Sequence, residues 1–145
     1  METVKLLKVD FEVPYPILVC TYTNMAVNNL LEGLDHTGVK PLRVGGKVNN
    51  EALRKHTLEY QLENHRLVPT VKKAMKEAEH VKTHMNHLEK KMDESGYDEQ
   101  ERLKMSLVNL ERRYLALQSK IYAIRHQMLR EIVGKADVVR EFDVF

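Results

Sequence analysis

Two long stretches of this sequence repeat apolar residues in alternating steps of three and four positions. This rhythm restricts both stretches to helices that bury one face. In the first stretch the repeated residues are Val71, Ala74, Ala78, Val81, Met85, Leu88 and Met92. In the second stretch they are Leu103, Leu107, Leu110, Tyr114, Leu117, Ile121, Ile124 and Met128. A repeat sustained over roughly four heptads is typical of a coiled coil.

A short polar segment separates the two repeats. Residues 93–97 (Asp-Glu-Ser-Gly-Tyr) have the composition of a turn. Helices joined by so short a connection lie side by side in opposite directions. The first register also runs back toward residue 51, so we expect a helical hairpin from roughly Glu51 to Val133. We expect a kink or break near Pro69, because proline lacks the amide hydrogen and clashes with the preceding turn.

The N-terminal region alternates between helix and strand patterns. Residues 2–8 have helical spacing. The apolar run 17–22 (Ile-Leu-Val-Cys-Thr-Tyr) is typical of a strand that is buried on both faces of a parallel sheet. Thr23 is a candidate N-cap for a helix over residues 24–36, and Gly38 occupies the place of a left-handed C-terminal cap.

Two further segments have strand patterns. Residues 42–44 (Leu-Arg-Val) follow the helix directly, and residues 136–139 (Ala-Asp-Val-Val) resemble a return strand after the second repeat. The order strand, helix, strand with short connections predicts a parallel crossover. We therefore expect a predominantly α-helical α/β fragment, in which a partial parallel sheet carries a long antiparallel two-helix coiled-coil arm.

The composition excludes several classes of protein. The net charge of +2 excludes a histone-like or polybasic chain, so any nucleic-acid contact must depend on the local placement of charge. A single cysteine, Cys20, excludes an internal disulfide and a cysteine-rich zinc cluster. No apolar run is long enough to cross a membrane and no signal pattern opens the sequence, so we expect an intracellular location, cytoplasmic or nuclear.

Three residues are candidates for contact with a nucleic-acid strand. Thr23 and Asn24 lie where a strand passes into a helix, so a hydroxyl, an amide and the helix N-terminus can all donate to a phosphate. A plain N-cap is the alternative. Arg43, inside an apolar strand, can contact nucleic acid or a carboxylate, and an ion pair at the edge of the core fits equally well. We expect Asn28 and Asn29 to face solvent.

Other reactive side chains favour ordinary structural roles. We expect Cys20 in the core, because a catalytic thiol needs a base and an accessible electropositive site. His80, His84 and His87 have a spacing that can chelate a metal, but they lie opposite the apolar seam or beside it. We expect them on the surface without a metal, and no catalytic acid, base or nucleophile is evident.

Three cations flank the seam of the second helix. Arg113, Lys120 and Arg125 can follow a phosphate backbone, or they can pair with Glu77 or Glu89 across the hairpin. The sequence alone leaves both interpretations open.

Residues 17–30 (ILVCTYTNMAVNNL) resemble motif Ia of superfamily 1 helicases of the nonsense-mediated-decay and senataxin type. In that motif an apolar strand and a Cys precede Thr or Ser, then Asn, then Ala-Val-Asp/Asn-x-Leu. Residues 38–45 (GVKPLRVG) are similar to the family's next strand, and residues 136–139 to the strand that re-enters its core. The helical hairpin resembles a stalk that carries an inserted β-barrel in some members.

The resemblance implies a RecA-like, P-loop NTPase motor. It assigns residues 1–46 to the motor core, 47–133 to the stalk, and 134–145 to a return strand and truncated tail. The implied function is that of an ATP-dependent RNA or DNA helicase, which uses ATP and Mg in its intact form. Motif Ia contacts the strand in such proteins, which would assign Thr23 and Asn24 to that contact, with Arg43 beside them. The implied partners are single-stranded RNA or DNA and the remainder of the helicase core, with no membrane.

The chain departs from this family pattern at two places. A loop ending in Gly-Lys-Thr precedes a helix like residues 2–8 in the family, whereas this sequence starts at Met1. Residues 140–145 (REFDVF) are more similar to the strand before the family's Asp-Glu box than to its Cys/Thr-rich motif. We therefore expect no cofactor in this chain, no ATP hydrolysis by it alone, and weak nucleic-acid binding. A non-catalytic coiled-coil module that pairs with another coiled coil is the alternative function.

Overall fold

The computed structural model describes residues 2–12, 14, 16–46 and 48–142, with the backbone alone for residue 5 and residues 138–142. The chain forms two compact units. The strand unit comprises residues 1–65 and 128–145, and the arm comprises residues 66–127. Predominantly helical structure is confirmed, as is the long two-helix arm.

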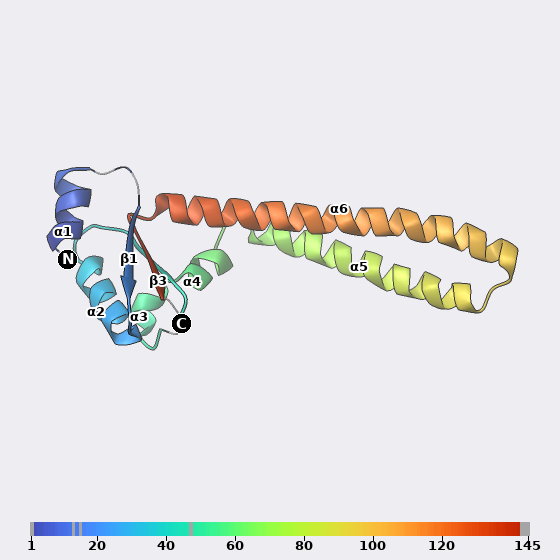
Figure 1. The fold of residues 1–145 in the computed structure, drawn as a ribbon, viewed down its shortest axis with the longest axis horizontal. Helices are drawn as coiled ribbons and strands as arrows, with labels where there is room; N and C mark the ends of the chain where they lie inside the picture. Colours follow the sequence, from blue (N-terminus) through green and yellow to red (C-terminus); the bar gives the residue numbers. More distant parts are fainter. Residues whose placement is uncertain (1, 13, 15, 47, 143–145) are drawn as a thin grey trace. The chain divides into compact units, whose positions relative to one another are not determined.

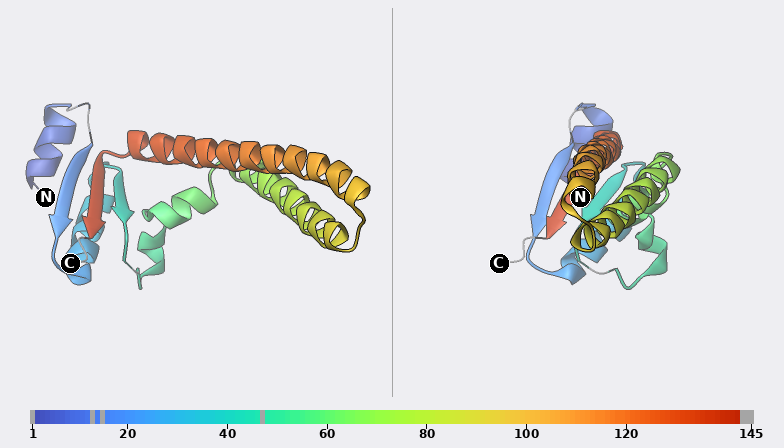
Figure 2. Two further views of the ribbon diagram at one scale, coloured as in Figure 1. Left: turned by 45° about the vertical axis from the view of Figure 1, so that its right-hand side comes forward. Right: turned by 90° about the vertical axis from the view of Figure 1, so that its right-hand side faces the viewer.

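The strand unit contains a three-stranded parallel sheet (Figure 2). Its elements in chain order are α1 (Glu2–Lys5), the π-helix η1 (Leu6–Asp10), β1 (Ile17–Thr21), α2 (Asn24–Asp35), β2 (Pro41–Val44) and β3 (Val138–Phe142). The strand order is β1-β3-β2, so the strand that comes last in the sequence lies between the first two. The parallel direction agrees with the sequence-based expectation.

The residue before β3 connects both neighbouring strands. The carbonyl of Asp137 accepts from the backbone N–H of Ile17, and its own N–H donates to the carbonyl of Lys40, both at 2.9 Å. The Asp137 carboxylate accepts a further hydrogen bond of 2.9 Å from the N–H of Lys40. These bonds set the register in which Ile17 and Pro41 both lie opposite Val138.

One face of the sheet packs against the N-terminal helices. Val4 of α1 and Leu34 of α2 form a buried cluster with Val39, and the side chains of Ile17 and Val19 pack against it. A second cluster joins α2 to the segment after β2, with Val27, Leu31 and Leu53 as its buried members.

The prediction that β1 is buried on both faces was wrong. Leu18 is 62 % exposed and Cys20 is exposed, while the alternate residues Ile17 and Val19 are half-buried. The physical reason is that α1 and α2 pack on the side of Ile17 and Val19, whereas the side chains of Leu18 and Cys20 alternate to the opposite face. Cys20 is therefore a surface residue and not part of the core.

The helical hairpin starts later than expected. The region that follows β2 forms two short helices, α3 (Glu51–Arg54) and α4 (Leu58–Glu63), before α5 begins at Val68. Between them Thr57 forms an isolated parallel bridge with Arg43, and the Arg43 N–H donates to the His56 carbonyl at 2.8 Å. This segment thus extends the β2 edge, which requires non-helical backbone.

The predicted kink or break near Pro69 is present as a break, because α4 ends at Glu63 and α5 begins only at Val68. Pro69 lies in the first turn of α5 (Val68–Asp93). An amide hydrogen at that position has no partner within a helix, so proline is tolerated there without bending it.

The arm consists of α5 and the greater part of α6 (Tyr97–Lys135), up to residue 127, and the two helices run in opposite directions (Figure 1). Arg113 pairs with Glu77 at 2.6 Å, and nearer the turn Lys91 lies 3.9 Å from Glu99. The repeated apolar residues of both helices are buried or half-buried, as the heptad pattern predicts. At the turn, Gln100 donates to the carbonyls of Met92 and Ser95 and fastens the connection.

No helix among the described residues is both long enough and apolar enough to span a bilayer. The C-terminal segment interpreted as a helicase-like strand, residues 140–145, contributes its first three residues to β3. Residues 143–145 lie outside the described part of the chain.

Candidate nucleic-acid interface

The three candidate residues gather at one edge of the sheet. Because β1 and β2 both run parallel to β3, their carboxyl ends lie at the same edge. Thr23 and Asn24 follow β1, and Arg43 lies near the end of β2. Ligands of open α/β sheets commonly bind outside the carboxyl ends of strands.

Thr23 begins α2 as its N-cap, as the sequence predicts. Its backbone is extended (φ −136°, ψ 146°), and its Oγ1 accepts a hydrogen bond of 3.2 Å from the N–H of Ala26. The hydroxyl is exposed and keeps its own hydrogen for a further acceptor. The cap therefore occupies the acceptor function of Thr23 and leaves its donor function open to a ligand.

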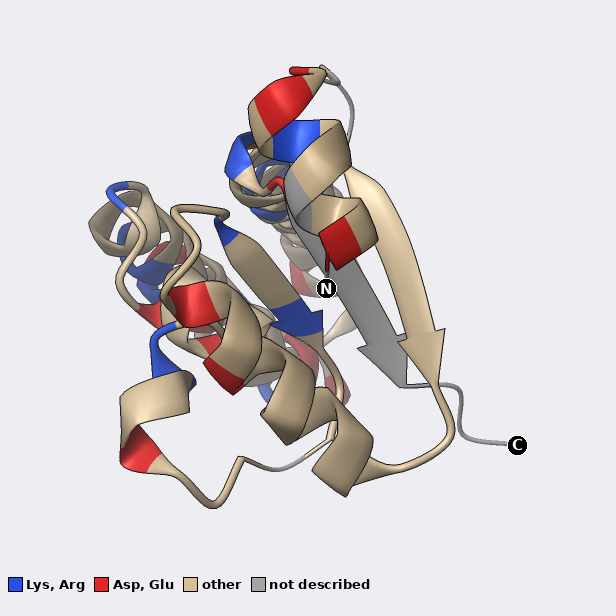
Figure 3. Cartoon of the chain, turned by 90° about the vertical axis from the view of Figure 1, so that its left-hand side faces the viewer, with Lys and Arg blue, Asp and Glu red and all other residues tan. Residues whose placement is uncertain are grey.

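Arg43 connects β2 to the first two turns of α2. Figure 3 shows the backbone of the strand unit with Lys and Arg in blue and Asp and Glu in red. Its Nη2 donates to Oδ1 of Asn24 at 2.8 Å, and its Nη1 donates to Oδ1 of Asn28 at 2.6 Å. Its Nε donates to the carbonyl of Gly45 at 3.1 Å. The planar guanidinium thereby holds two amide side chains and a backbone turn in one arrangement.

The Arg43 side chain lies inside the unit, with only 1 % of its surface exposed. Burial lowers the pKa of its guanidinium below the ordinary value, and the negative charge of Glu59 opposes this shift. The bonds to Asn24, Asn28 and Gly45 give Arg43 a positioning role, and its contact with a nucleic-acid strand stays a prediction. In this geometry Arg43 positions its neighbours.

The amide of Asn24 is oriented by this contact. Its carbonyl oxygen faces the guanidinium, so its Nδ2 is the group left to donate outward. Asn24 is exposed at the start of α2, where backbone donors and the helix dipole also favour an anion. Thr23 and Asn24 together present a hydroxyl and an amide donor at one helix N-terminus.

Gly46 completes the site by having no side chain. Its φ of +72° is unfavourable for other residues. A Cβ there would lie 2.6 Å from Arg43 Nη2 and 2.7 Å from Asn24 Oδ1. The glycine therefore allows the loop to pass directly over the Arg43–Asn24 hydrogen bond.

Asn28 and Gly46 were not predicted from the sequence to belong to the site. Asn28 was expected to face solvent, but it is half-buried and accepts from Arg43. A signal was available, since Asn24 and Asn28 are four residues apart and share one helix face. The two asparagines did not indicate a buried arginine as their partner, because Arg43 lies 15 residues beyond Asn28 in the chain.

The remaining candidates lie elsewhere. His80, His84 and His87 are exposed on α5, and the described residues contain no group of His, Cys, Asp or Glu able to hold a metal ion. Arg113 pairs with Glu77, which confirms one of the two interpretations of that residue. Arg125 Nη2 lies 3.5 Å from the sulfur of Met75.

Comparison with known proteins gives one informative match. A family model described as an AAA domain matches residues 3–140, which is almost the whole chain. The comparison with curated proteins gave no match. The family match spans the strands, the candidate interface and the arm together, and the chain belongs to this AAA-domain family.

Proposed function

We propose that the chain is part of the motor domain of an ATP-dependent RNA or DNA helicase of superfamily 1. In this proposal the parallel sheet belongs to a RecA-like core, Thr23 and Asn24 contact the nucleic-acid strand, and the arm is a stalk. The AAA-domain match supports the motor family. The observation that carries the strand contact is the Arg43–Asn24 hydrogen bond, which orients an amide donor at the start of α2.

The site acts on a phosphate by donation. Asn24 Nδ2 and the Thr23 hydroxyl donate to phosphate oxygens, and the helix N-terminus favours the negative charge. Arg43 stays behind this surface and keeps the Asn24 amide from rotating. Contacts of this kind position a strand without reading its bases, so we expect binding to be independent of sequence.

The residues of this chain do not fit a nucleoside triphosphate. A phosphate-binding loop needs glycines followed by Lys and then Ser or Thr, between a strand and a helix. The two Gly-Lys pairs, at 46–47 and 134–135, are followed by Val and Ala. ATP and Mg are therefore assigned to other parts of the proposed motor.

A second candidate function is that of a helical interaction module. Val108, Leu115 and Tyr122 recur every seven residues on α6 and are exposed, with Leu115 at 64 % and Tyr122 at 74 %. They lie outside the seam that faces α5, so α6 offers a second apolar face to a helical partner. This observation favours pairing through that face and not through the Leu/Met seam.

The strand contact is tested by fluorescence anisotropy with a labelled single-stranded RNA and the same sequence as DNA. We expect Thr23→Ala with Asn24→Ala to weaken binding about tenfold, since hydrogen bonds to charged groups contribute on the order of 1.5–3 kcal/mol. Asn29→Ala is the matched control on the same helix and should change the affinity less than about twofold. Equal affinities for the double variant and the unaltered chain would remove this site from the proposal.

A further inference from the structure

Charge is distributed unevenly along the arm. Residues 66–91 and 112–127, nearer the strand unit in sequence, contain eleven Lys and Arg but three Asp and Glu. Residues 92–111, around the turn, contain two Lys and Arg but six Asp and Glu. The low net charge of the whole chain therefore conceals one strongly basic half of a helical hairpin.

A groove between α5 and α6 lies in this basic half. It has a volume of about 450 Å³, and its lining combines Lys73, Lys76, His80 and His84 of α5 with Arg113 of α6. The α5 residues follow one another at steps of three or four positions, so they form a row on one helix face. At 1.5 Å per residue the row is about 16 Å long.

One carboxylate lies among the cations of this groove. The Arg113 hydrogen bond holds the pKa of Glu77 below its ordinary value, with burial opposing and with the charges of Arg113, Lys120 and Lys73 adding to the effect. Within the described residues, Lys73, Lys76 and Lys120 form no ion pair of 4.0 Å or less. The groove thus has more positive charge than Glu77 can balance.

The chemistry of the groove suits a phosphate backbone better than a protein segment. Both walls are helices whose backbone donors are bonded internally, so an extended peptide finds no strand edge to pair with. Val81 and Leu110 are its apolar lining residues, too few to receive the spaced anchors of an amphipathic helix. Point charges along a line match a strand of repeated phosphates.

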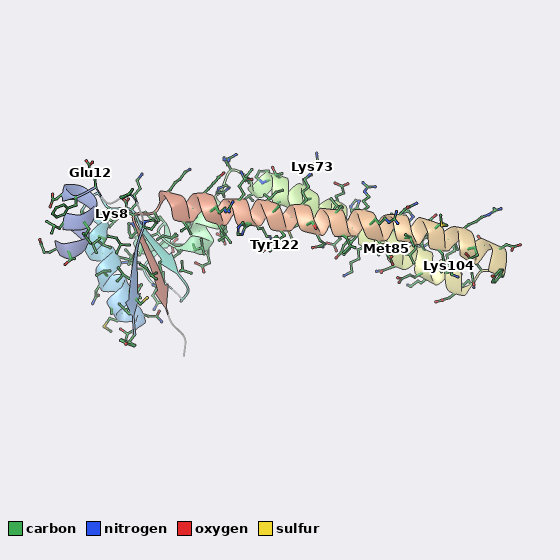
Figure 4. All side chains as sticks on the ribbon, turned by 45° about the horizontal axis from the view of Figure 1, so that its top comes forward. Lys8, Glu12, Lys73, Met85, Lys104 and Tyr122 are labelled. Atoms are coloured by element: carbon green, nitrogen blue, oxygen red, sulfur yellow. The ribbon has the colours of Figure 1, made fainter. Side chains whose placement is uncertain are left out.

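We propose that this basic groove of the arm binds the phosphates of a single-stranded nucleic acid, as a second site separate from Thr23 and Asn24. The groove faces away from the exposed α6 stripe: Lys73 and Tyr122 extend from opposite sides of the arm (Figure 4). It also gives His80, His84 and Arg113 a common role, that of lining one anionic ligand.

The test uses the full chain and a fluorescein-labelled 20-nucleotide poly(U), with binding measured by anisotropy at several salt concentrations. Lys73→Glu with Lys76→Glu should weaken binding at least about tenfold at low salt. It should also lower the slope of log affinity against log salt by roughly 1.4, because each lost phosphate contact on a single strand removes about 0.7. Lys72→Glu with Lys90→Glu is the matched control: the same charge change on exposed α5 residues outside the lining.

Equal losses in the groove variant and the control would overturn the proposal, because they would show general attraction to the arm. A second variant works in the opposite direction. Glu77→Gln keeps the size of the side chain and releases Arg113, so binding should tighten about threefold. No tightening, with an unchanged helical circular dichroism spectrum, also contradicts the groove.

The two sites are separated by their salt dependence. Thr23→Ala with Asn24→Ala changes no charge, so it should reduce affinity while the slope contributed by the groove remains. If the groove variant lowers the salt slope while Thr23→Ala with Asn24→Ala has no effect, the result supports the groove as a binding site. The same result contradicts the site at Thr23 and Asn24. Displacement of the strand by inorganic phosphate at constant ionic strength would show a site for a free anion and overturn the assignment to a strand.

Discussion

The arm and the strand unit differ in how far apart along the chain their contacting residues lie. In the arm each buried residue has its helical neighbours three or four positions away, and the two helices meet across one short turn. In the strand unit, β1 and β2 pair with a strand that follows them by about a hundred residues and do not pair with each other. Contacts of the first kind form readily, whereas the second kind must overcome the entropy of closing a long loop.

The largest expected effect comes from removing β3. A chain that stops after Lys135 loses both parallel ladders, so β1 and β2 should lose their protection from amide hydrogen exchange. Residues 66–127 should keep their protection and the helical circular dichroism signal, because the arm depends on its own seam. Persistent protection in β1 and β2 would show that the sheet does not depend on its central strand.

The effect of a core substitution on stability should be confined to the unit that contains it. Leu31→Ala, at a position with 1 % exposure in the strand unit, should lower the free energy of unfolding by about 2–5 kcal/mol. Leu117→Ala, 7 % exposed in the arm, should act similarly on the arm. Hydrogen exchange followed residue by residue distinguishes the two regions. Spread of either effect through both regions contradicts their independence.

Alanine substitutions at two glycines, one inside the candidate interface and one outside it, test how tightly this interface is packed. Gly46→Ala places a Cβ against Arg43 and Asn24 at a positive φ, so we expect it to cost about 1–3 kcal/mol and to weaken strand binding. Gly38 has a similar φ of +76°, but a Cβ at that position would have no atom within 4 Å. Gly38→Ala should therefore cost about 1 kcal/mol and leave binding unchanged. Equal effects in denaturant unfolding would show that the close approach is unimportant.

The smallest expected effect is a loss of stability in acid. The pKa of Asp35 is lowered from 3.8, mainly by its hydrogen bond to His56 and then by Lys55. A lowered carboxyl pKa contributes stability above the unfolded value, and this contribution is lost as the pH falls below about 3.8 toward the folded pKa. Asp35→Asn should make the free energy of unfolding of the strand unit fall less steeply as the pH is lowered. Glu77→Gln should have the same effect on the arm. The prediction is contradicted if the unfolding curves of both variants between about pH 5 and pH 2 match the curve of the unaltered chain.

The sequence predicts those features that depend on nearby residues. The seam of the arm, the Thr23 cap and the positive φ of Gly38 all follow from patterns a few residues long, and all three are confirmed. The family match also agrees with the resemblance of residues 17–30 at the level of an AAA domain. Strand contact by Thr23 and Asn24 stays a prediction.

Features that depend on distant residues were missed. Cys20 has the neighbours of a buried strand, but its side chain lies on the face of β1 opposite to the one that packs against α1 and α2. The bridge between Arg43 and Thr57 interrupts a stretch whose own pattern is helical. Asn28 owes its place to a guanidinium on another element. In each case the deciding contact is outside any window in which a periodic pattern can be seen.

The central position of β3 has a consequence for synthesis on the ribosome. The first two strands emerge early, but the strand that joins them emerges only after both helices of the arm. Until then β1 and β2 lack the strand with which both of them pair. The arm is made in the meantime, and as an antiparallel hairpin it returns the chain close to its starting point. Once formed, this hairpin shortens the effective length of the loop between β2 and β3, which lowers the entropy cost of closing the sheet.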